Sequence, residues 1–481
     1  GAVLVGAAFS AATAATAQPV AQTSSQTVTS QTPKYVFLFI GDGMSYPQIQ
    51  AAADYKGAMA QGAGPEILAG PSKMPFMNFP AAGSATTFDS TSFCPDSAST
   101  ATSLSTGHKT YSGVINMDEQ KKVAYETIAE KAKEQLGYKV GIVSTVNLNH
   151  ATPAAFYAHQ PSRNNYYEIG QELVASGFDY FAGGALLSPT GKDNKQTSVY
   201  DLAKEAGYKV ITTQSEASQL TAQDGPALLI GETLADSDAL SYDNDRQNNE
   251  WALKDYVRKG IEVLNNDKGF FMMVEGGKID WACHANDAAT VFNEVKDMDD
   301  AIKVAYEFYK KHPKETLIVV TADHETGGIV LGTGRYELNL KALQYQKHSA
   351  DGLSKQISEL RKSKGNKVTW EDMKEFLGNE MGFWKQFPIS WEQEKKLRDE
   401  FEQSFVRNKV VFAESMYSKS EPMAARAKEV MDQISMVGWV SGGHSAGYVP
   451  VFAIGAGSQL FGEKIDNTEI PKRIAKAAGY K

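Results

Sequence analysis

Six short stretches of the sequence end apolar runs with residues that can bind a metal ion or attack an electrophile. They are Gly41-Asp42-Gly43, Asp96-Ser97-Ala98, His150-Ala151-Thr152, Glu275 through His284, Asp323-His324 and His444. Together with Arg163 they supply imidazoles, carboxylates, hydroxyls and one guanidinium. Zinc takes tetrahedral nitrogen and oxygen ligands, whereas magnesium takes oxygens. The inventory therefore predicts a zinc pair and one harder ion around a serine, which is the equipment for cleaving a phosphate ester.

One of these stretches places a serine where a helix is expected to begin. Ser97 follows Pro95 and Asp96 and precedes a run of small residues that tolerate a helix. At a helix N-terminus, backbone N–H groups and the helix dipole favour an alkoxide and an incoming phosphoryl oxygen. Asp96 or Ser97 could instead act only as a helix cap, the usual role of such residues. Because no histidine lies nearby in sequence to act as a base, a serine activated by metal ions is the favoured interpretation.

The stretch from Glu275 to His284 has the spacing of a shared metal site. Asp280 and His284 are four residues apart, so on a helix they project from one face and can bind one ion. Glu275 precedes a glycine pair at an expected strand end and is free to reach a different ion. The alternative is an ordinary helix start with an exposed His284, which these neighbours disfavour. Cys283 would point away from the face that Asp280 and His284 share.

Two further stretches bring histidines next to expected strand ends or loops. Asp323 and His324 end an apolar run and can bend onto one metal at a strand-to-loop turn. His444 lies in a glycine-rich loop that can approach the site from outside the sheet. The remaining histidines lack such neighbours and are predicted to be structural or solvent-exposed: His108, His159, His312 and His348.

Short β-branched or aromatic runs alternate with helical patterns along the chain. The runs expected to form strands are residues 35–40, 140–146, 269–274, 316–321 and 449–454, with helical patterns at 124–136 and 291–310. This alternation predicts an α/β fold, a three-layer sandwich in which helices cover both faces of a mostly parallel sheet. Four of the runs lead to Asp42, His150, Glu275 and Asp323. Since ligands bind at the carboxyl ends of strands in such sheets, these side chains are expected to converge.

The N-terminal region differs in character from the rest. Residues 1–17 are small and apolar and end in Ala15-Thr16-Ala17, a signal-peptidase pattern. They predict the remnant of a signal peptide, and therefore a periplasmic or secreted protein; a disordered tail is the alternative. Residues 18–33 are too polar to pack and are expected to form a disordered linker.

A second change in character occurs near the C-terminal end. Residues 336–436 are rich in Lys and Glu and show amphipathic helices without strand signals. We expect a helical insertion, or cap, within an α/β domain made of residues 34–335 and 437–481. Its aromatic residues are expected to pack a small core of their own: Trp370, Phe376, Trp384, Trp391 and Phe401.

Composition narrows the possible partners. The 481-residue chain is 42% hydrophobic and carries a formal net charge of -9, which argues against a nucleic-acid binding surface. No apolar run after the N-terminal region is long enough to span a bilayer. The only cysteines are Cys94 and Cys283, which are interpreted as two buried free thiols rather than a disulfide. An acidic protein must attract a phosphate dianion with local positive charge at the site.

In these motifs the chain resembles the bacterial alkaline phosphatases from Tyr35 to the C-terminus. The resemblance rests on the order and completeness of the motifs, because each alone is weak. They are Ile40-Gly41-Asp42-Gly43-Met44, Asp96-Ser97-Ala98, His150-Ala151-Thr152-Pro153-Ala154 followed by Arg163, Glu275 through His284, Thr321-Ala322-Asp323-His324, and Gly443-His444-Ser445. The resemblance implies hydrolysis of phosphate monoesters over a broad substrate range, and favours a homodimer.

The resemblance also implies two zinc ions and one magnesium ion per active site. One zinc would be bound by Asp280, His284 and His444. The other would be bound by Asp42, Asp323, His324 and the oxygen of Ser97. Magnesium would be bound by Asp42, Thr152 and Glu275, and Arg163 would clamp two phosphoryl oxygens. Ser97 would attack phosphorus to form a phosphoserine, which water then hydrolyses.

The chain departs from the family pattern at two positions. His150 stands where some relatives have Asp, and Trp281 stands where some have Lys. The loss of a carboxylate and a cation beside the magnesium and the phosphate is expected to change magnesium affinity and weaken the hold on product. Whether His150 contacts a metal directly is left open by the sequence.

Two other functions are compatible with parts of the pattern. A phosphodiesterase or sulfatase of the same superfamily is the first alternative, although Cys94-Pro95-Asp96 does not fit the C/S-x-P-x-R frame of sulfatases. A secreted protein that binds metal or phosphate without turnover is the second. Ser97 and Arg163 beside a full set of ligands argue against it.

Overall fold

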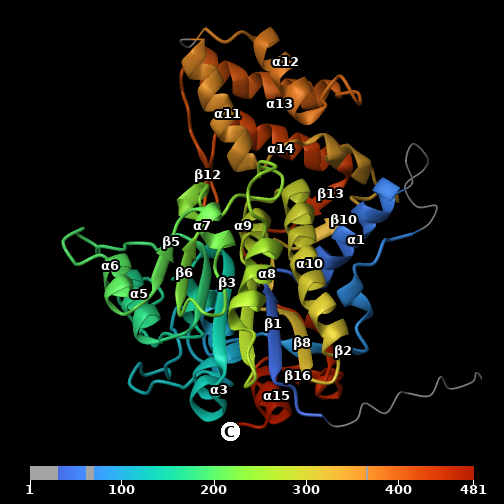
Figure 1. Ribbon diagram of the computed structural model, residues 1–481. Coiled ribbons are helices and arrows are strands. Elements are labelled where there is room, and N and C mark those ends of the chain that lie inside the picture. The colour runs from blue at the N-terminus through green and yellow to red at the C-terminus, as the bar shows by residue number, and fades with distance from the viewer. Residues whose placement is uncertain (1–30, 61–69, 365–366) are drawn as a thin grey trace, which may run out of the picture.

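The computed structural model describes residues 31–60, 70–364 and 367–481. The expected signal peptide and residues 18–30 of the expected linker lie outside these ranges. A ten-stranded sheet forms the centre of the molecule (Figure 1). In order across the sheet its strands are β16 (Lys464–Asp466), β2 (Ala81–Thr86), β15 (Val449–Gly455), β8 (Thr316–Ala322), β1 (Tyr35–Gly41), β7 (Phe270–Gly276), β3 (Lys139–Asn147), β4 (Tyr180–Gly184), β6 (Ala227–Ile230) and β5 (Lys209–Ile211).

The sheet is mostly parallel, as predicted. All neighbouring strands from β8 to β5 pair in parallel, while β15 runs antiparallel to both β8 and β2. The five expected strands are all present as β1, β3, β7, β8 and β15. β4, β5 and β6 are additional parallel strands of three to five residues, and such short runs carry little periodic signal.

Helices cover both faces of the sheet. In β7, Phe270 packs against Phe308 with ring centroids 5.8 Å apart, whereas Phe271 packs against Phe156 at 6.1 Å. Because successive side chains of a strand point to opposite faces, the two contacts lie on opposite sides of the sheet. The α-helices outside residues 336–436 are α1 (Tyr46–Ala60), α2 (Ser97–Thr106), α3 (Ile128–Leu136), α4 (Ala151–Ala154), α5 (Tyr166–Ala175), α6 (Val199–Glu205), α7 (Gln214–Ser218), α8 (Leu253–Leu264), α9 (Lys278–His284), α10 (Ala288–Lys311) and α15 (Glu469–Ala478).

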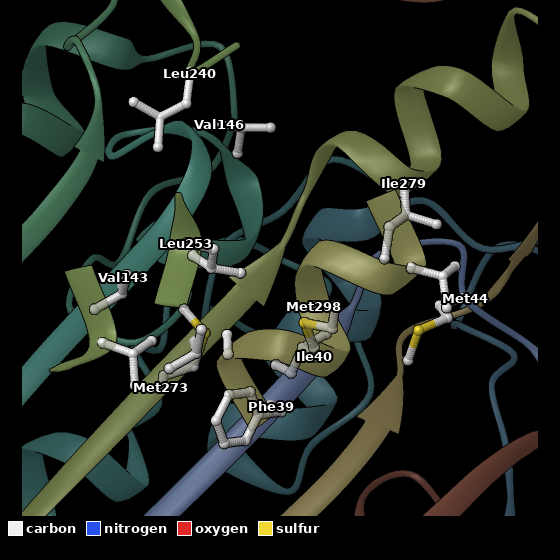
Figure 2. Close-up of a cluster of buried hydrophobic side chains, with 14 of the residues drawn as sticks. Phe39, Ile40, Met44, Val143, Val146, Leu240, Leu253, Met273, Ile279 and Met298 are labelled. Atoms are coloured by element: carbon white, nitrogen blue, oxygen red, sulfur yellow. The ribbon is translucent and has the colours of Figure 1, made fainter. Parts of the chain in front are cut away.

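The hydrophobic core extends up to the strand ends that carry the candidate site. Figure 2 shows Phe39 and Ile40 of β1, Met298 of α10, Ile279 of α9 and Met44 as members of one cluster of buried hydrophobic side chains. All five side chains are buried. Close packing of this kind leaves little freedom for the backbone just beyond it. The polar residues that follow β1 and precede α9 are therefore held in place by apolar contacts.

The segment 336–436 is mainly helical and lies above the carboxyl ends of the parallel strands (Figure 1). Its α-helices are α11 (Ala350–Ser363), α12 (Trp370–Met381), α13 (Trp391–Phe401) and α14 (Pro422–Ser435). The Trp370 ring contacts those of Trp384 and Phe401 at centroid distances of 6.1 and 5.6 Å, so these aromatics pack on each other. Trp391 does not belong to this core, because it is 71% exposed.

The expectation that this segment lacks strands is wrong. β11 (Ala413–Glu414) and β12 (Lys419–Ser420) form a small antiparallel hairpin within it. Strands of two residues have no alternation that a sequence could reveal. At the base of the segment, β10 (Ile329–Leu331) pairs with β13 (Val437–Trp439), which brings its two ends together. The division into an α/β domain and an insertion remains a proposal, which this pairing supports.

The two cysteines are free, and only one of them is buried. Cys283 is buried on α9, as expected, whereas Cys94 is exposed in the turn before α2. The expectation of two buried thiols is therefore wrong for Cys94, because its apolar neighbour Phe93 is also exposed and no core forms around the turn. Within the described ranges, no helix combines the length and the apolar character that a membrane span requires.

The histidines outside the candidate site motifs make structural contacts, as predicted. His108 stacks on Tyr125 with ring centroids 4.0 Å apart. His312 packs against Phe308 at 4.6 Å, and His348 lies 2.8 Å from a carboxylate oxygen of Glu380.

His159 joins two helices through glutamates and is expected to make stability depend on pH. Its Nε2 lies 3.0 Å from Glu130 of α3 and its Nδ1 lies 3.6 Å from Glu172 of α5. Burial lowers the pKa of His159, but hydrogen bonds and charges from both glutamates outweigh burial and raise it to about 10. The unfolded value is about 6.5. A pKa raised on folding stabilises the fold below the unfolded value, and this stabilisation is lost as pH rises toward the folded value.

We therefore expect His159→Gln to cost more stability at pH 6 than at pH 10. The difference in the loss of stability should be on the order of 1 to 2 kcal/mol, because His159 and both glutamates are partly exposed and solvent screens their interaction. Chemical denaturation of both proteins at the two pH values measures it. An equal loss of stability at pH 6 and pH 10 would contradict a protonated His159.

Candidate active site

Four strand ends deliver the candidate site residues to one place. β1 lies between β7 and β8, with Ile40 in register with Glu275 on one side and with Thr321 on the other. Asp42 therefore emerges between Glu275 and Asp323. The expected convergence at the carboxyl ends of the parallel strands is what the structure has.

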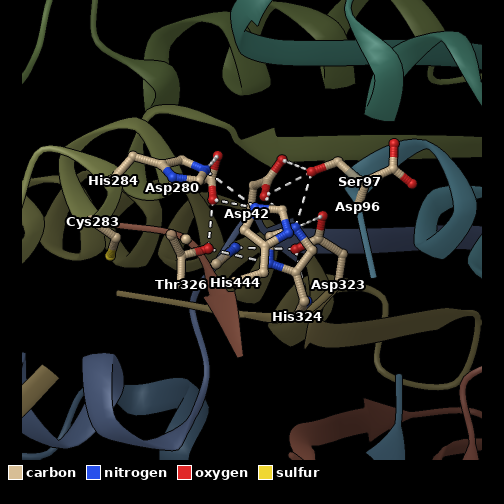
Figure 3. Close-up of polar contacts among 12 residues, drawn as sticks. Asp42, Asp96, Ser97, Asp280, Cys283, His284, Asp323, His324, Thr326 and His444 are labelled. Atoms are coloured by element: carbon tan, nitrogen blue, oxygen red, sulfur yellow. Dashed lines mark hydrogen bonds and ion pairs between the residues drawn. The ribbon is translucent and has the colours of Figure 1, made fainter. Parts of the chain in front are cut away.

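Asp42, Asp323 and His324 form a compact group of ligand atoms (Figure 3). His324 Nε2 lies 3.3 Å from Asp42 Oδ1 and 3.2 Å from Asp323 Oδ2. The backbone N–H of Gly43 donates to Asp323 Oδ1 at 3.0 Å, and Gly43 has φ +72°, so the turn after β1 requires glycine here. One carboxylate oxygen of Asp323 is thereby oriented by the backbone, which leaves the other for a cation.

A second group of ligand atoms lies beside the first. Asp280, His324 and His444 offer atoms within 4.8 Å of one another. His284 Nε2 is 3.3 Å from Asp280 Oδ2 and 3.2 Å from His444 Nε2, so it belongs to the same cluster. Asp280 and His284 do project from one face of α9, as their spacing predicts. Cys283, on the same helix, lies apart from the cluster (Figure 3).

Carbonyl groups hold the two histidine rings in position. His284 Nδ1 lies 2.6 Å from the carbonyl oxygen of Gly442, and His444 Nδ1 lies 2.5 Å from that of Pro95. Each Nδ1 therefore faces a carbonyl oxygen, and each Nε2 faces the cluster. Rings that bind metal ions are commonly oriented in this way.

Ser97 lies at the first position of α2, directly against the first ligand group. Its Oγ is 3.0 Å from His324 Nε2 and 3.2 and 3.3 Å from the two oxygens of Asp42 (Figure 3). Asp96 is the N-cap and accepts a hydrogen bond from the backbone N–H of Ser99. The capping role and the hydroxyl that contacts the ligand group thus fall on successive residues. The first backbone N–H groups of α2 have no partner within the helix, so the helix start favours negative charge.

Oxygen atoms gather on the other side of Asp42. Thr152 Oγ1 lies 3.5 Å from Asp42 Oδ2, and Ser144 Oγ donates to Glu275 Oε2 at 2.5 Å. Glu275 Oε1 is buried and has no hydrogen-bond partner among the described residues. A buried carboxylate oxygen without a partner is costly unless a cation or water binds it. This oxygen-only group suits a hard cation such as magnesium.

Several carboxylates of the cluster are buried close to one another. Burial, together with the charges of Asp323, Asp280 and Glu275, raises the pKa of Asp42 well above its ordinary value. Burial is also the main cause that raises the pKa of Glu275 to about 7 and that of Asp323 to about 6. These crowded carboxylates, together with the ring nitrogens of His284, His324 and His444, form a donor set that divalent cations fit.

Arg163 reaches this site through Asp96. Its Nη1 lies 3.1 Å from Asp96 Oδ2, beside Ser97, and its side chain is 16% exposed. Its Nη2 donates to the hydroxyl of Tyr417 at 3.0 Å. Tyr417 comes from the β11–β12 hairpin and was missed by the sequence analysis. Its only sequence signal is an aromatic residue among small polar ones, which would not distinguish it from any exposed loop residue.

His150 and Trp281 form an aromatic cluster with Tyr417 at the edge of the site. Trp281 and Tyr417 stack with ring centroids 5.1 Å apart, and the His150 ring lies 5.2 Å from Tyr417 and 5.9 Å from Trp281. Burial, and then the charge of Arg163, lower the pKa of His150 to about 3, so this ring is neutral. His150 thus packs with aromatic rings, two residues before Thr152 in the sequence.

The fold and this donor set define a class of enzyme, the metal-binding hydrolases. A sequence model of the alkaline phosphatase family matches residues 33–480. Alkaline phosphatase 4 of Bacillus subtilis (strain 168) is 31% identical over 450 residues, which cover 92% of this chain and 88% of that protein. Alkaline phosphatase 3 of the same organism is 34% identical over 404 residues, covering 80% of this chain and 77% of that protein.

Solved structures agree with these matches. The cold-active alkaline phosphatase of a psychrophilic Shewanella species superimposes with a TM-score of 0.76 at 27% identity, covering 92% of this chain and 99% of that one. A His-to-Glu mutant of the TAB5 alkaline phosphatase, solved with Mg bound in its M3 site, gives a TM-score of 0.64 at 27% identity and covers 94% of this chain and 100% of that one. The chain is an enzyme of the alkaline phosphatase family, whose members depend on metal ions.

Proposed function

We propose that the protein hydrolyses phosphate monoesters through a phosphoserine formed on Ser97. One observation carries this proposal: Ser97 Oγ lies at the start of α2 and within 3.0 to 3.3 Å of Asp42 and His324. A hydroxyl placed there is at a helix N-terminus, which favours an alkoxide and an incoming phosphoryl group. It is also against a group of side chains suited to a cation that would ionise it.

We propose two zinc ions and one magnesium ion, each with a named set of ligands. Asp280, His284 and His444 would bind the first zinc, and Asp42, Asp323, His324 and Ser97 would bind the second. Asp42, Thr152 and Glu275 would bind magnesium. When bound, such ions supply Lewis-acid charge that lowers the pKa of hydroxyl groups and water and stabilises a departing oxygen. With Arg163 they would outweigh the four carboxylates and leave the pocket positive, which an acidic protein needs to attract phosphate.

The residues of the chain account for the remaining steps. Arg163, held by Asp96, would bind two phosphoryl oxygens with its planar fork and orient phosphorus toward Ser97. Ser97 Oγ would form the bond to phosphorus as the bond to the alcohol oxygen breaks. The backbone N–H groups of α2 would stabilise charge on the phosphoryl oxygens. Water would then attack the phosphoserine from the side that the alcohol vacated, which releases phosphate and restores the serine.

The space beside the site supports a broad substrate range. A cavity of about 670 Å³ is lined by His150, Trp281 and Tyr417, and also by Tyr166 and Met416. Its walls come from the α/β domain and from the β11–β12 hairpin. A cavity of this size leaves room for an alcohol portion of variable shape. Recognition would then rest on the phosphoryl group, which all substrates share.

A phosphodiesterase or sulfatase of the same superfamily is the competing function. Rates on p-nitrophenyl phosphate, bis(p-nitrophenyl) phosphate and p-nitrophenyl sulfate distinguish the three activities. We expect the monoester to be favoured by at least about a thousandfold in kcat/KM, because Arg163 and the cations would bind a dianion better than a monoanion. A diester or sulfate rate equal to the monoester rate would refute the proposal, and no turnover of any ester would favour a binding protein.

His150→Asp is expected to strengthen magnesium binding. The substitution places a carboxylate beside Thr152 and Glu275, and magnesium prefers charged oxygen ligands to an imidazole. After chelation and zinc reconstitution, a magnesium titration of activity should reach its midpoint at about tenfold lower magnesium than for the native chain. His108→Asp makes the same change far from the site and should leave the midpoint in place. An unchanged midpoint in His150→Asp would contradict the assignment of this group to magnesium.

We further propose that the protein is exported to the periplasm or the medium and acts as a homodimer. The A-x-A pattern at Ala15-Thr16-Ala17 supports export. Light scattering of the purified protein tests the dimer, and N-terminal sequencing of the exported protein tests the cleavage site.

A further inference from the structure

The tip of one hairpin in the segment 336–436 reaches into the candidate site. β11 and β12 pair Glu414 with Lys419, which leaves residues 415–418 as the connecting loop. The backbone N–H of Ser415 donates to the carbonyl oxygen of Ser418 at 2.9 Å and closes this loop. Tyr417 lies in the closed loop, so the hairpin presents its side chain at a defined position.

Within the described ranges, the hydrogen bond of the Tyr417 hydroxyl and the ring contacts of Tyr417 join it to residues of the candidate site. Its hydroxyl accepts a hydrogen bond from Arg163 at 3.0 Å. Its ring stacks on Trp281 with an interplanar angle of 22° and meets the edges of His150 and His284, the latter at 5.6 Å. Tyr417 thus contacts the phosphate clamp, a zinc ligand and both positions at which the chain departs from the family pattern.

Tyr417 holds one of the two guanidinium nitrogens that Arg163 would need for phosphate. Asp96 holds Nη1 at 3.1 Å, and the Tyr417 hydroxyl holds Nη2 at 3.0 Å. An arginine side chain carries about 2 kcal/mol of rotamer entropy, which binding must overcome unless the fork is already oriented. With only Asp96 as a partner, the guanidinium could turn about its Nη1 contact. The hydroxyl therefore prevents a rotation that would misplace the clamp.

The position of Tyr417 is set by the helices of the insertion. β12 leads directly into Glu421, which is buried at the start of α14. Glu421 accepts from Arg361 of α11 at 3.0 Å, and its backbone N–H donates to Ser354 Oγ at 2.9 Å. These contacts tie the end of the hairpin to α11 and α14. The helices of the insertion therefore position the hairpin, and through the Tyr417 hydroxyl they contact Arg163.

We propose that Tyr417 is a positioning residue for Arg163, through which the helical insertion sets how tightly the site holds the phosphoryl group. The inference rests on the proposed function, because it requires Arg163 to bind phosphoryl oxygens. It assigns the insertion a role in substrate and product binding. Trp281 and His150 provide the surface on which the Tyr417 ring packs.

Tyr417→Phe tests the inference, because it removes the hydroxyl and keeps the ring. We expect KM for p-nitrophenyl phosphate and the competitive inhibition constant of inorganic phosphate to rise together by about five- to tenfold, the usual cost of one lost intramolecular hydrogen bond. The turnover number should change by less than about twofold, since the lost contact serves bound substrate and transition state alike. Tyr336→Phe, at a fully exposed tyrosine, makes the same chemical change and should alter neither constant.

A double-mutant cycle with Arg163→Ala identifies the path of the effect. If Tyr417 acts through Arg163, Tyr417→Phe should change the phosphate inhibition constant by less than about twofold once Arg163 is alanine. An equal effect in both backgrounds, or none in the native background, overturns the inference. If Arg163→Ala weakens phosphate binding but Tyr417→Phe does not, only the role of Tyr417 fails. If Arg163→Ala itself has no effect, the phosphate clamp of the proposed function fails as well.

Discussion

Ser97→Ala should lower the turnover of p-nitrophenyl phosphate by at least about a thousandfold, because it removes the hydroxyl that we propose attacks phosphorus. Ser97 Oγ is the hydroxyl found within 3.0 Å of His324 at the start of α2. Alanine is smaller and a good helix former, so the variant should fold. Asp42, Asp323 and His324 remain as proposed ligands, so it should also keep its metal ions. Rapid-quench kinetics with labelled substrate should show no phosphorylated protein in the variant and a phosphoserine in the native chain.

Two controls make this result specific to the nucleophile. Ser215→Ala removes an exposed hydroxyl at the start of α7 and should leave turnover unchanged. Metal content of Ser97→Ala, measured by elemental analysis, should match that of the native chain within experimental error. Phosphate release at the native rate by Ser97→Ala would refute the assignment of the nucleophile, even if the family and the fold stand.

Removing the metal ions should abolish activity and lower thermal stability together. Asp42, Glu275, Asp280 and Asp323 are buried in one cluster, where their charges repel each other without cations between them. Ions that bind only the folded state at a thousand times their dissociation constant contribute about 4 kcal/mol of stability each. Dialysis against a chelator should therefore lower the melting temperature by at least about 5 °C and reduce turnover to background.

Adding the ions back separately tests the proposed stoichiometry. Zinc alone should restore part of the activity, and zinc with magnesium should restore all of it, because the two kinds of site offer different ligand types. Elemental analysis at full activity should give about two zinc ions per magnesium ion. A chelated sample that keeps full turnover, or full activity with magnesium alone, would contradict the proposed metal centre.

The parts of the fold that could be predicted are those in which a local pattern and the tertiary structure agree. β1, β3, β7, β8 and β15 are buried runs with strong apolar character, and each lies within about two residues of its expected position. The strands that were missed are mostly short or at the sheet edges, such as β5 and β16. β2 lies inside the sheet, but its residues are mainly Ala, Gly, Ser and Thr and give no apolar run. Their pairing depends on neighbours far along the chain, so a short run leaves no local signature.

The same division holds for the site. That Asp42, Glu275 and Asp323 meet could be predicted, because adjacent parallel strands end at one edge of a sheet. That Asp280 and His284 share a helix face could also be predicted, from their spacing alone. The partners of Arg163 could not: Asp96 lies 67 positions and Tyr417 254 positions away in sequence. The exposure of Cys94 was likewise decided by a turn that makes no core contact.

By itself, the order of residues determined which chemical groups end each strand and begin each helix, since side-chain type and backbone periodicity are local properties. Tertiary structure alone decided which loop from the insertion reaches the site, and that Tyr417 is at its tip. The physical reason is that a loop follows the contacts at its two ends. For this hairpin those contacts are the pairing of Glu414 with Lys419 and the buried Glu421, whose partners Arg361 and Ser354 lie on α11, far away in sequence.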